Sequence, residues 1–171
     1  LFANGVSVGK SLFEPDMKGQ AQDIMAGATN AGCEIVLPVD ATVAQAFKAG
    51  ATNQTVSVDA VPPNSMILDV GPDSIDDLVQ RLGRCRTVLW NGPLGAFEIT
   101  PFDTGTNNVA CEAARLTQAG LLLSVAGGGD TVAALANAGA VDQFSYVSTA
   151  GGAFLEWLEG KTLPGVAALE E

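Results

Sequence analysis

The fold is decided by a single stretch of sequence, LLLSVAGGGDT at residues 121–131. An apolar run of strand length ends there in three glycines, and an aspartate and a threonine follow. Apolarity that is continuous, without polar residues at alternate positions, is typical of a strand buried on both faces of a parallel sheet. Beyond the glycines, Val132, Leu135 and Ala136 have helical spacing. The stretch therefore predicts a buried strand that turns directly into a helix.

The same alternation of strand and helix extends along the rest of the chain. Further apolar runs of strand length lie at 34–39, 66–70, 87–90 and 144–147, and Thr55–Val58 is expected as a sixth, short strand at an edge or in a hairpin. Helical spacing occurs at 75–82, 109–116 and 154–158, with Asp73 and Ser74 as candidate N-caps of the first helix. This order predicts one α/β domain, a Rossmann-like three-layer parallel sheet with helices on both faces.

Charge limits the classes of partner. The chain of 171 residues is 47% hydrophobic and carries a formal net charge of −11, which suits a globular domain and argues against binding to nucleic acid or to an anionic membrane. No apolar run approaches the roughly 20 residues of a membrane span. An anionic ligand must therefore be held by backbone N–H groups, a metal ion or a few basic side chains.

Residue types restrict the chemistry further. There is no histidine, which removes Ser-His-Asp and Cys-His catalysis and histidine-based metal sites. Cys33, Cys85 and Cys111 are scattered without metal-ligand spacing, and we expect reduced, buried thiols in a cytosolic protein. The chain begins at Leu1 without an initiator methionine, so we expect it to be incomplete.

Four of the predicted strands end in glycine, proline or small polar residues, at 71–73, 91–93, 127–130 and 148–152. In an open parallel sheet the carboxyl ends of the strands share one edge, and ligands bind there. The turn at 127–131 is the strongest candidate, because glycines give a ligand close access to the N–H groups that begin a helix. Asp130 can coordinate Mg²⁺ beside a phosphate, and Thr131 can donate a hydroxyl. The alternative is a structural turn with Asp130 as N-cap.

Two look-alike motifs are rejected. Gly127 and Gly129 resemble a dinucleotide fingerprint, but valine replaces its third glycine and no acidic residue follows about 20 positions later. Residues 5–11 resemble a P-loop, but one residue is missing between the glycines.

Two more segments belong to the same edge. In residues 91–98 a rigid loop presents Glu98, which can accept hydrogen bonds from ribose hydroxyls or is simply an exposed loop glutamate. Residues 148–153 form a second glycine-rich corner, either a second anion site or a tight turn for helix packing.

Taken in order, the motifs resemble the C-terminal portion of phosphoglycerate kinases. They are VGKSL at 8–12, LPVD at 37–40, DVGP at 69–72, WNGPLGAFE at 90–98, GGGDT at 127–131, STAGGA at 148–153 and LEGKTLPGV at 158–166. The resemblance runs from about Leu1 to the end. It implies reversible phosphoryl transfer between ATP and 3-phosphoglycerate, giving ADP and 1,3-bisphosphoglycerate, in a cytoplasmic glycolytic enzyme that is monomeric when intact. It also implies that residues 1–171 are most of the nucleotide-binding domain of a two-domain kinase.

The resemblance also assigns residues to roles. Asp130 matches the Mg²⁺-nucleotide aspartate, and Gly151 and Gly152 match the glycines that face the transferring phosphoryl group. The other nucleotide-binding matches are Gly71 beside the adenine pocket, Asn91 and Pro93 in the pocket wall, Glu98 at the ribose, and Gly127, Gly128, Gly129 and Thr131 at the phosphates. Ala150 and Ala96 depart from the family pattern without removing a ligand group.

The resemblance covers only part of the family's chain. The resemblance implies that the N-terminal domain with the phosphoglycerate site and the start of the C-terminal domain are missing from the chain, so we expect that these residues alone cannot catalyse the reaction. Loss of early strands is expected to expose an apolar sheet edge that invites association. The rival interpretation is a non-catalytic nucleotide-binding or interaction module that retains the fold.

Overall fold

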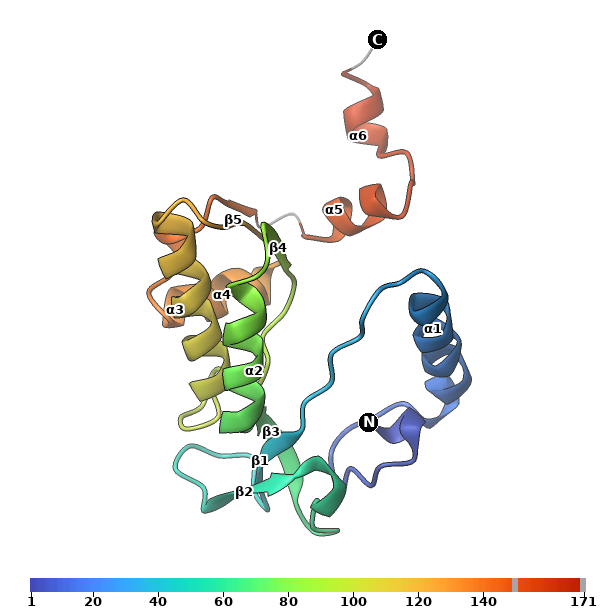
Figure 1. Ribbon diagram of the computed structural model, residues 1–171, viewed down its shortest axis with the longest axis vertical. Helices are drawn as coiled ribbons and strands as arrows, with labels where there is room; N and C mark the ends of the chain where they lie inside the picture. The colour runs from blue at the N-terminus through green and yellow to red at the C-terminus, as the bar shows by residue number, and fades with distance from the viewer. Residues whose placement is uncertain (149–150, 170–171) are drawn as a thin grey trace.

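Residues 1–148 and 151–169 are described by the structure, a computed structural model. They form two three-stranded sheets with helices around them (Figure 1). The elements are, in chain order, η1 (Phe2–Asn4), η2 (Pro15–Met17), α1 (Lys18–Asn30), β1 (Asp40–Ala44), β2 (Asn53–Ser57), η3 (Val58–Ala60), β3 (Met66–Val70), α2 (Pro72–Leu82), β4 (Thr87–Trp90), α3 (Thr104–Gln118), β5 (Leu123–Gly127), α4 (Gly129–Asn137), η4 (Val141–Gln143), β6 (Tyr146–Ser148), α5 (Gly151–Leu158) and α6 (Pro164–Ala167).

The predicted α/β class is confirmed by a parallel sheet in the order β4-β5-β6. One face of this sheet packs on the main core, where Trp90 and Ala126 meet apolar side chains of α2, α3 and α4. Trp90 contacts Phe144 edge to face, with ring centroids 6.1 Å apart. The helical spacing read at 109–116 is confirmed, because Val109, Ala113 and Leu116 are buried in α3. Burial of this helical stripe fixes α3 against the sheet.

The opposite face of the parallel sheet is open along much of its length. In the strand register Leu89 aligns with Val125 and Val125 with Tyr146, so the three side chains share a face. Leu89 is 40% exposed, Leu123 54% and Tyr146 62%. Near the carboxyl ends of the strands, α5 and α6 approach this face and line a cavity with Val125 and Tyr146. Elsewhere no helix of the described residues covers this face as parallel sheets are normally covered.

Residues 66–70 form a strand, as predicted, but they do not belong to the parallel sheet. The second sheet has the order β2-β1-β3, and both strand pairs are antiparallel. The connections 45–52 and 58–65 contain no helix longer than one turn, and such short connections join antiparallel strands. The short strand expected near Thr55–Val58 is confirmed as β2, an edge strand in a hairpin with β1.

The prediction of a strand at 34–39 is wrong for the described structure. These residues form an irregular connection between α1 and β1 (Figure 1), and Ile35, Val36 and Leu37 are exposed. A strand needs a hydrogen-bonded neighbour for its backbone groups, and no described strand pairs with this segment. Sequence periodicity also missed α1, because this helix has no buried residue and thus no apolar stripe to recognise.

Buried Asp40 fixes the start of α2. The expected N-caps Asp73 and Ser74 are instead the second and third residues of the helix, after Gly71 at the N-cap. The Asp40 carboxylate accepts hydrogen bonds from the backbone nitrogens of Asp73 (3.1 Å) and Ser74 (2.8 Å) and from the Ser74 hydroxyl (2.6 Å). Burial raises the pKa of Asp40, but these hydrogen bonds outweigh burial and hold it below its usual value.

Buried Asp69 fixes the start of α3. Its carboxylate accepts hydrogen bonds from the backbone nitrogens of Gly105 (2.7 Å) in the first turn of α3 and of Val70 (2.8 Å). Burial raises the pKa of Asp69 to about 6, against the lowering effect of these two bonds. A carboxylate on a strand thus satisfies free N–H groups of the helix that packs beside the parallel sheet.

The cysteines are free thiols, as expected, but they are not buried. Cys33, Cys85 and Cys111 are all exposed. Cys33 and Cys85 follow the ends of α1 and α2, and Cys111 lies on the outer side of α3. Sequence composition alone could not place them, because small apolar residues are tolerated at helix ends as well as in cores.

Candidate nucleotide site at the carboxyl edge of the parallel sheet

Three segments meet where β4, β5 and β6 end, and we call them the carboxyl-edge site: residues 91–98, 127–131 and 151–152. Gly128 has φ 102° and ψ 146°, a backbone conformation that only glycine adopts readily, and it is the N-cap of α4. Its N–H donates to the carbonyl oxygen of Ser148 at 3.1 Å, which joins the end of β5 to the end of β6. The first N–H groups of α4 are therefore directed outward from a fixed corner.

Gly151 packs directly on this corner. A Cβ atom at Gly151 would lie 2.5 Å from the backbone nitrogen of Gly128, closer than real Cβ contacts allow. The close approach brings the N-terminus of α5 beside that of α4. Gly152 has open space around its Cα and is exposed. Thr149 and Ala150, which belong to the same predicted motif, lie outside the described residues.

Thr131 connects the α4 corner to the loop after β4. Its side chain is 2% exposed, and its hydroxyl oxygen accepts a hydrogen bond from the backbone N–H of Gly92 at 2.7 Å. Asn91 lies alongside, with its amide oxygen 3.7 Å from the position of a Cβ built on Gly128. The sequence predicted that Thr131 donates its hydroxyl to a phosphate. In the structure the hydroxyl oxygen already has a backbone partner, and its hydrogen is left to be donated.

The loop at 91–98 is held at several points. The Trp90 indole nitrogen donates to the carbonyl oxygen of Gly92 at 2.7 Å, and the backbone nitrogen of Leu94 donates to the Thr106 hydroxyl at 3.0 Å. At its far end, Asn137 donates from Nδ2 to the carbonyl oxygen of Phe97 at 3.2 Å. Thr131 and Asn137 are six residues apart on α4, about 9 Å along the helix axis. The loop is thus attached to both ends of α4.

Two carboxylates of this site are solvent-exposed. Asp130 lies in the first turn of α4, and Glu98 follows the buried Phe97 in the loop at 91–98. Neither 91–98 nor 127–131 nor 148–152 contains a lysine or an arginine. An anion at this edge would therefore have to be held by backbone N–H groups, the α4 and α5 dipoles or a cation.

The described residues contain no cluster of three or more His, Cys, Asp or Glu side chains that could hold a metal ion. A lone carboxylate such as Asp130 fits Mg²⁺ held jointly by one protein ligand and by substrate phosphates, which is the usual mode for this ion. Asp130 is the residue that would hold it.

Gly71 lies apart from this group. It follows the end of β3 in the antiparallel sheet and is the N-cap of α2, and a Cβ atom there would overlap the Asp40 carboxylate. The expectation that residues 71–73 share an edge with the other strand ends is therefore wrong, since β3 is not part of the parallel sheet. Pro93 lies in the loop at 91–98, as predicted from the sequence order, and is partly exposed.

Sequence reasoning missed Thr106 and Asn137, the two side chains that hold the loop from α3 and α4. A threonine or an asparagine within a helix carries no motif, and only the tertiary contact shows its partner.

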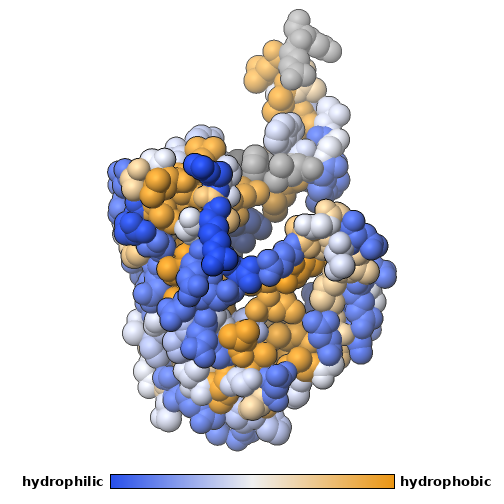
Figure 2. Space-filling view, viewed as in Figure 1, coloured by the Kyte–Doolittle hydropathy of each residue, from blue (hydrophilic) through white to orange (hydrophobic). Residues whose placement is uncertain are grey.

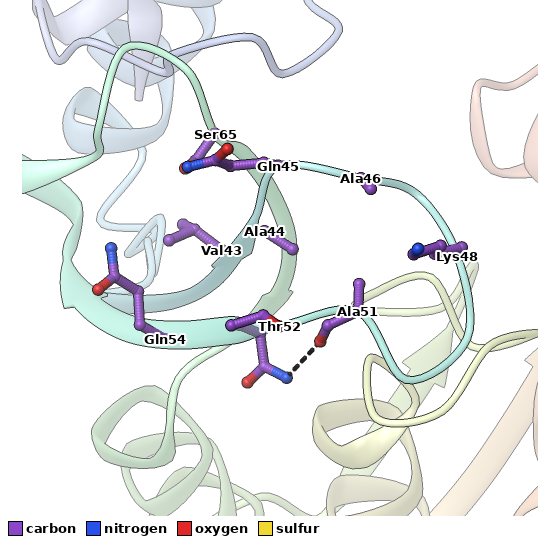
Figure 3. Close-up of a pocket in the computed structure, with 10 residues that line it drawn as sticks. Val43, Ala44, Gln45, Ala46, Lys48, Ala51, Thr52, Gln54 and Ser65 are labelled. Carbon is purple, nitrogen blue, oxygen red and sulfur yellow. Dashed lines mark hydrogen bonds between the residues drawn. The ribbon is translucent and has the colours of Figure 1, made fainter.

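A separate cavity of about 460 Å³ opens beside the β1–β2 hairpin (Figure 3). Lys48 is the charged residue among those that line it, and the remaining lining is small or neutral, such as Ala44, Thr52 and Ser65. It includes none of the predicted site residues. Among the described helices, none is both long and apolar enough to cross a membrane.

Comparison with known proteins places these observations in a family. A family model described as phosphoglycerate kinase matches residues 1–161. Relatives named phosphoglycerate kinase from Ruegeria sp. (strain TM1040) and Chelativorans sp. (strain BNC1) are 63% and 62% identical over 99% and 100% of this chain. The chain spans 43% of the length of each relative.

Solved structures agree. The phosphoglycerate kinase from Coxiella burnetii superposes with a TM-score of 0.93 and 43% identity, over 99% of this chain and 43% of that one. The enzyme from Pyrococcus horikoshii OT3 superposes with a TM-score of 0.74 and 25% identity, over 99% and 42%.

Proposed function

Because this chain belongs to the phosphoglycerate kinase family, we propose that its carboxyl-edge site is the Mg-nucleotide half of a phosphoglycerate kinase active site. The observation that supports this most directly is the convergence of three loops on one corner, joined by the Gly92–Thr131 and Gly128–Ser148 hydrogen bonds. Phosphoryl transfer depends mainly on positioning and on stabilising charge, and a corner built from fixed N–H groups supplies both.

The roles follow from the position of each residue. The N–H groups at Gly129 and Asp130 bind the phosphates at the start of α4. Gly128, whose own N–H donates to Ser148, gives the phosphates close access to these groups, and Gly127 ends the strand beneath them. Asp130 holds Mg²⁺, which supplies charge neutralisation at the phosphates when bound. Glu98 accepts hydrogen bonds from the ribose, and the loop residues Asn91 and Pro93 line the nucleotide pocket. Thr131 donates its remaining hydroxyl hydrogen to a phosphate oxygen.

Gly151 and Gly152 begin the neighbouring helix, and their N–H groups face the phosphoryl group during transfer. For Gly71 we propose the family's place beside the adenine pocket, in addition to its contact with Asp40. In the reaction, the bond breaks between the γ-phosphorus of ATP and the oxygen that bridges it to the β-phosphate, and ADP leaves. A new bond forms between the γ-phosphorus and a carboxylate oxygen of 3-phosphoglycerate. The reverse reaction regenerates ATP from 1,3-bisphosphoglycerate.

We propose that the acceptor is bound by residues outside this chain, in the N-terminal domain of a longer cytoplasmic and monomeric enzyme. The basis is the length of the relatives, of which this chain matches 43%. On this reading the 171 residues alone give no turnover.

The proposal is tested by calorimetric titration of the purified chain with Mg-ADP. We expect binding, about tenfold weaker or more in Asp130→Ala, because the metal ligand is lost. Asp142→Ala is the matched control, since it removes the same charge from an exposed position in η4 and should leave binding unchanged. A folded chain that binds no Mg-ADP would overturn the assignment.

A second experiment distinguishes the proposed kinase from the rival function, a non-catalytic nucleotide-binding module. This chain replaces the matching portion of the Ruegeria relative, and the chimera is assayed for phosphoryl transfer from ATP to 3-phosphoglycerate. We expect turnover that Asp130→Ala greatly reduces. An inactive, folded chimera whose fragment still binds Mg-ADP favours the module.

A further inference from the structure

The cavity beside the β1–β2 hairpin has an apolar floor and polar side chains around it (Figure 3). Val43 and Ala44 of β1 and Ala51 of the following loop form the floor, and each is no more than 5% exposed. The side chains around it include the exposed amides of Gln45 and Gln54. The volume of about 460 Å³ lies in the range of sites for small molecules, and such sites combine an apolar lining with a few polar groups.

Lys48 gives this cavity a positive charge that the protein does not neutralise. Its side chain extends from the hairpin loop toward the cavity (Figure 3). The ion pairs of the described residues are formed by Arg81, Arg115 and Lys161, and none includes Lys48. Among the described residues that line the cavity there is no aspartate or glutamate, although the chain has 19 of them. An anion in the cavity would therefore meet attraction from Lys48 without repulsion from the lining.

Ser65 adds a buried polar group without a partner. It is 4% exposed and lines the cavity. Its backbone N–H donates to the carbonyl oxygen of Pro62 at 3.0 Å, and its carbonyl oxygen accepts from the Lys10 N–H at 2.8 Å. Its hydroxyl makes no hydrogen bond with any described residue. Buried hydroxyls normally have a hydrogen-bond partner, so this one is suited to bind a ligand in the cavity.

The hairpin loop that carries Lys48 is held in place. The backbone nitrogen of Gly50 donates to the carbonyl oxygen of Thr100 at 2.9 Å, which ties the loop to the body of the domain. Ala44 and Ala51 belong to a buried apolar cluster that also contains Phe102. The floor and the loop are therefore formed before a ligand arrives, which lowers the entropic cost of binding.

We propose that this cavity binds a small organic monoanion with several hydroxyl groups, a compound of the sugar-acid type. Lys48 pairs with its carboxylate, and Ser65, Gln45 and Gln54 form hydrogen bonds with its hydroxyl groups. One ammonium group matches one negative charge. A phosphate ester carries nearly two charges and would need a second cation or a helix N-terminus, and the described lining has neither. The inference goes beyond the nucleotide role of the carboxyl-edge site, because the cavity includes none of its residues.

The test is an NMR titration of the ¹⁵N-labelled chain with gluconate. We expect the amide signals of residues 45–54 and 65 to shift, with a Kd of about 1 mM or tighter. Sorbitol has the same carbon skeleton without the charge and should bind about tenfold more weakly or less, because it cannot pair with Lys48. The same titration of the chain saturated with Mg-ADP should give an unchanged Kd. The gluconate shifts can be measured whether or not Mg-ADP binds, so the two proposals can fail separately.

Three variants assign the contacts. Lys48→Gln removes the charge but keeps a polar side chain, and it should weaken gluconate binding by about tenfold or more. Lys18→Gln is the matched control, because it makes the same change at an exposed lysine of α1 and should bind gluconate like the parent. Ser65→Ala should weaken binding severalfold while urea unfolding stays close to that of the parent, because the hydroxyl has no protein partner to lose.

Four results would overturn the proposal. They are the absence of gluconate shifts at the cavity, equal binding of sorbitol and gluconate, equal binding of gluconate by Lys48→Gln and Lys18→Gln, and displacement of gluconate by Mg-ADP. A Ser65→Ala chain that unfolds more easily but binds gluconate like the parent would overturn the role given to Ser65.

Discussion

The Thr131 hydroxyl oxygen accepts a 2.7 Å hydrogen bond from the backbone nitrogen of Gly92, so a buried side chain of α4 fixes the loop that follows β4. These residues are 39 positions apart in the chain. The bond joins the corner at 127–131 to the loop that carries Glu98, and the proposed phosphoryl-transfer site depends on such positioning.

Replacing Thr131 with valine keeps the shape of the side chain but leaves the Gly92 N–H without its partner. We expect a loss of about 1–3 kcal/mol in the free energy of unfolding, measured with urea, and weaker Mg-ADP binding. Thr131→Ser keeps the hydroxyl and should stay close to the parent in both. Equal behaviour of the valine and serine variants would contradict this role.

Removing the Asn137 amide should separate nucleoside binding from phosphate binding. Asn137→Ala releases the Phe97 carbonyl oxygen and frees the end of the loop that presents Glu98. We expect Mg-ADP affinity to fall severalfold while the affinity for magnesium pyrophosphate is unchanged, because the α4 N-terminus is intact. Asn108→Ala, which removes a comparable side-chain hydrogen bond on α3, is the control. A parallel loss of both affinities would mean that Asn137 acts through the whole fold.

Gly71→Ala tests whether Gly71 is mainly structural. The added methyl group would overlap the Asp40 carboxylate, which holds the start of α2. We expect unfolding to become easier by about 1–3 kcal/mol, as for other overpacked sites. Thermal unfolding and Mg-ADP titration are measured together. Unchanged stability with lost nucleotide binding would instead assign Gly71 to the ligand.

Asp69 should make stability depend on pH between about 4 and 6. Its pKa is raised to about 6 in the folded protein from an ordinary value of 3.8, so the folded state holds the proton more tightly than the unfolded state. The stabilising contribution is complete below the unfolded pKa and is lost as pH rises through the folded pKa.

The measurement compares urea unfolding of the parent and Asp69→Asn from pH 4 to 7. The advantage of the parent over the variant should shrink as pH rises, because asparagine does not titrate. Both Asp69 oxygens accept backbone N–H bonds, so the variant should be less stable at pH 4. A difference that stays constant over this range would show that Asp69 does not titrate there.

Local patterns predicted much of this fold. The apolar runs at 66–70 and 87–90 correspond to β3 and β4, and the helical spacing at 75–82 falls within α2. The same reasoning failed at 34–39, where the apolar run has no described strand to pair with. It also failed to separate β3 from the parallel sheet, because strand direction depends on the connection and not on the strand's own residues.

The glycine-rich turn at 127–131, the order of the family motifs and the absence of basic residues from the proposed site can all be read from the sequence alone. Those properties are local, because they depend on residue type and spacing. Only the folded chain shows that Thr131 holds Gly92, that Asn137 holds Phe97 and that Gly71 packs against Asp40. It also shows that one sheet face stays open. These are contacts between residues far apart in the chain, and packing sets them where local preference cannot.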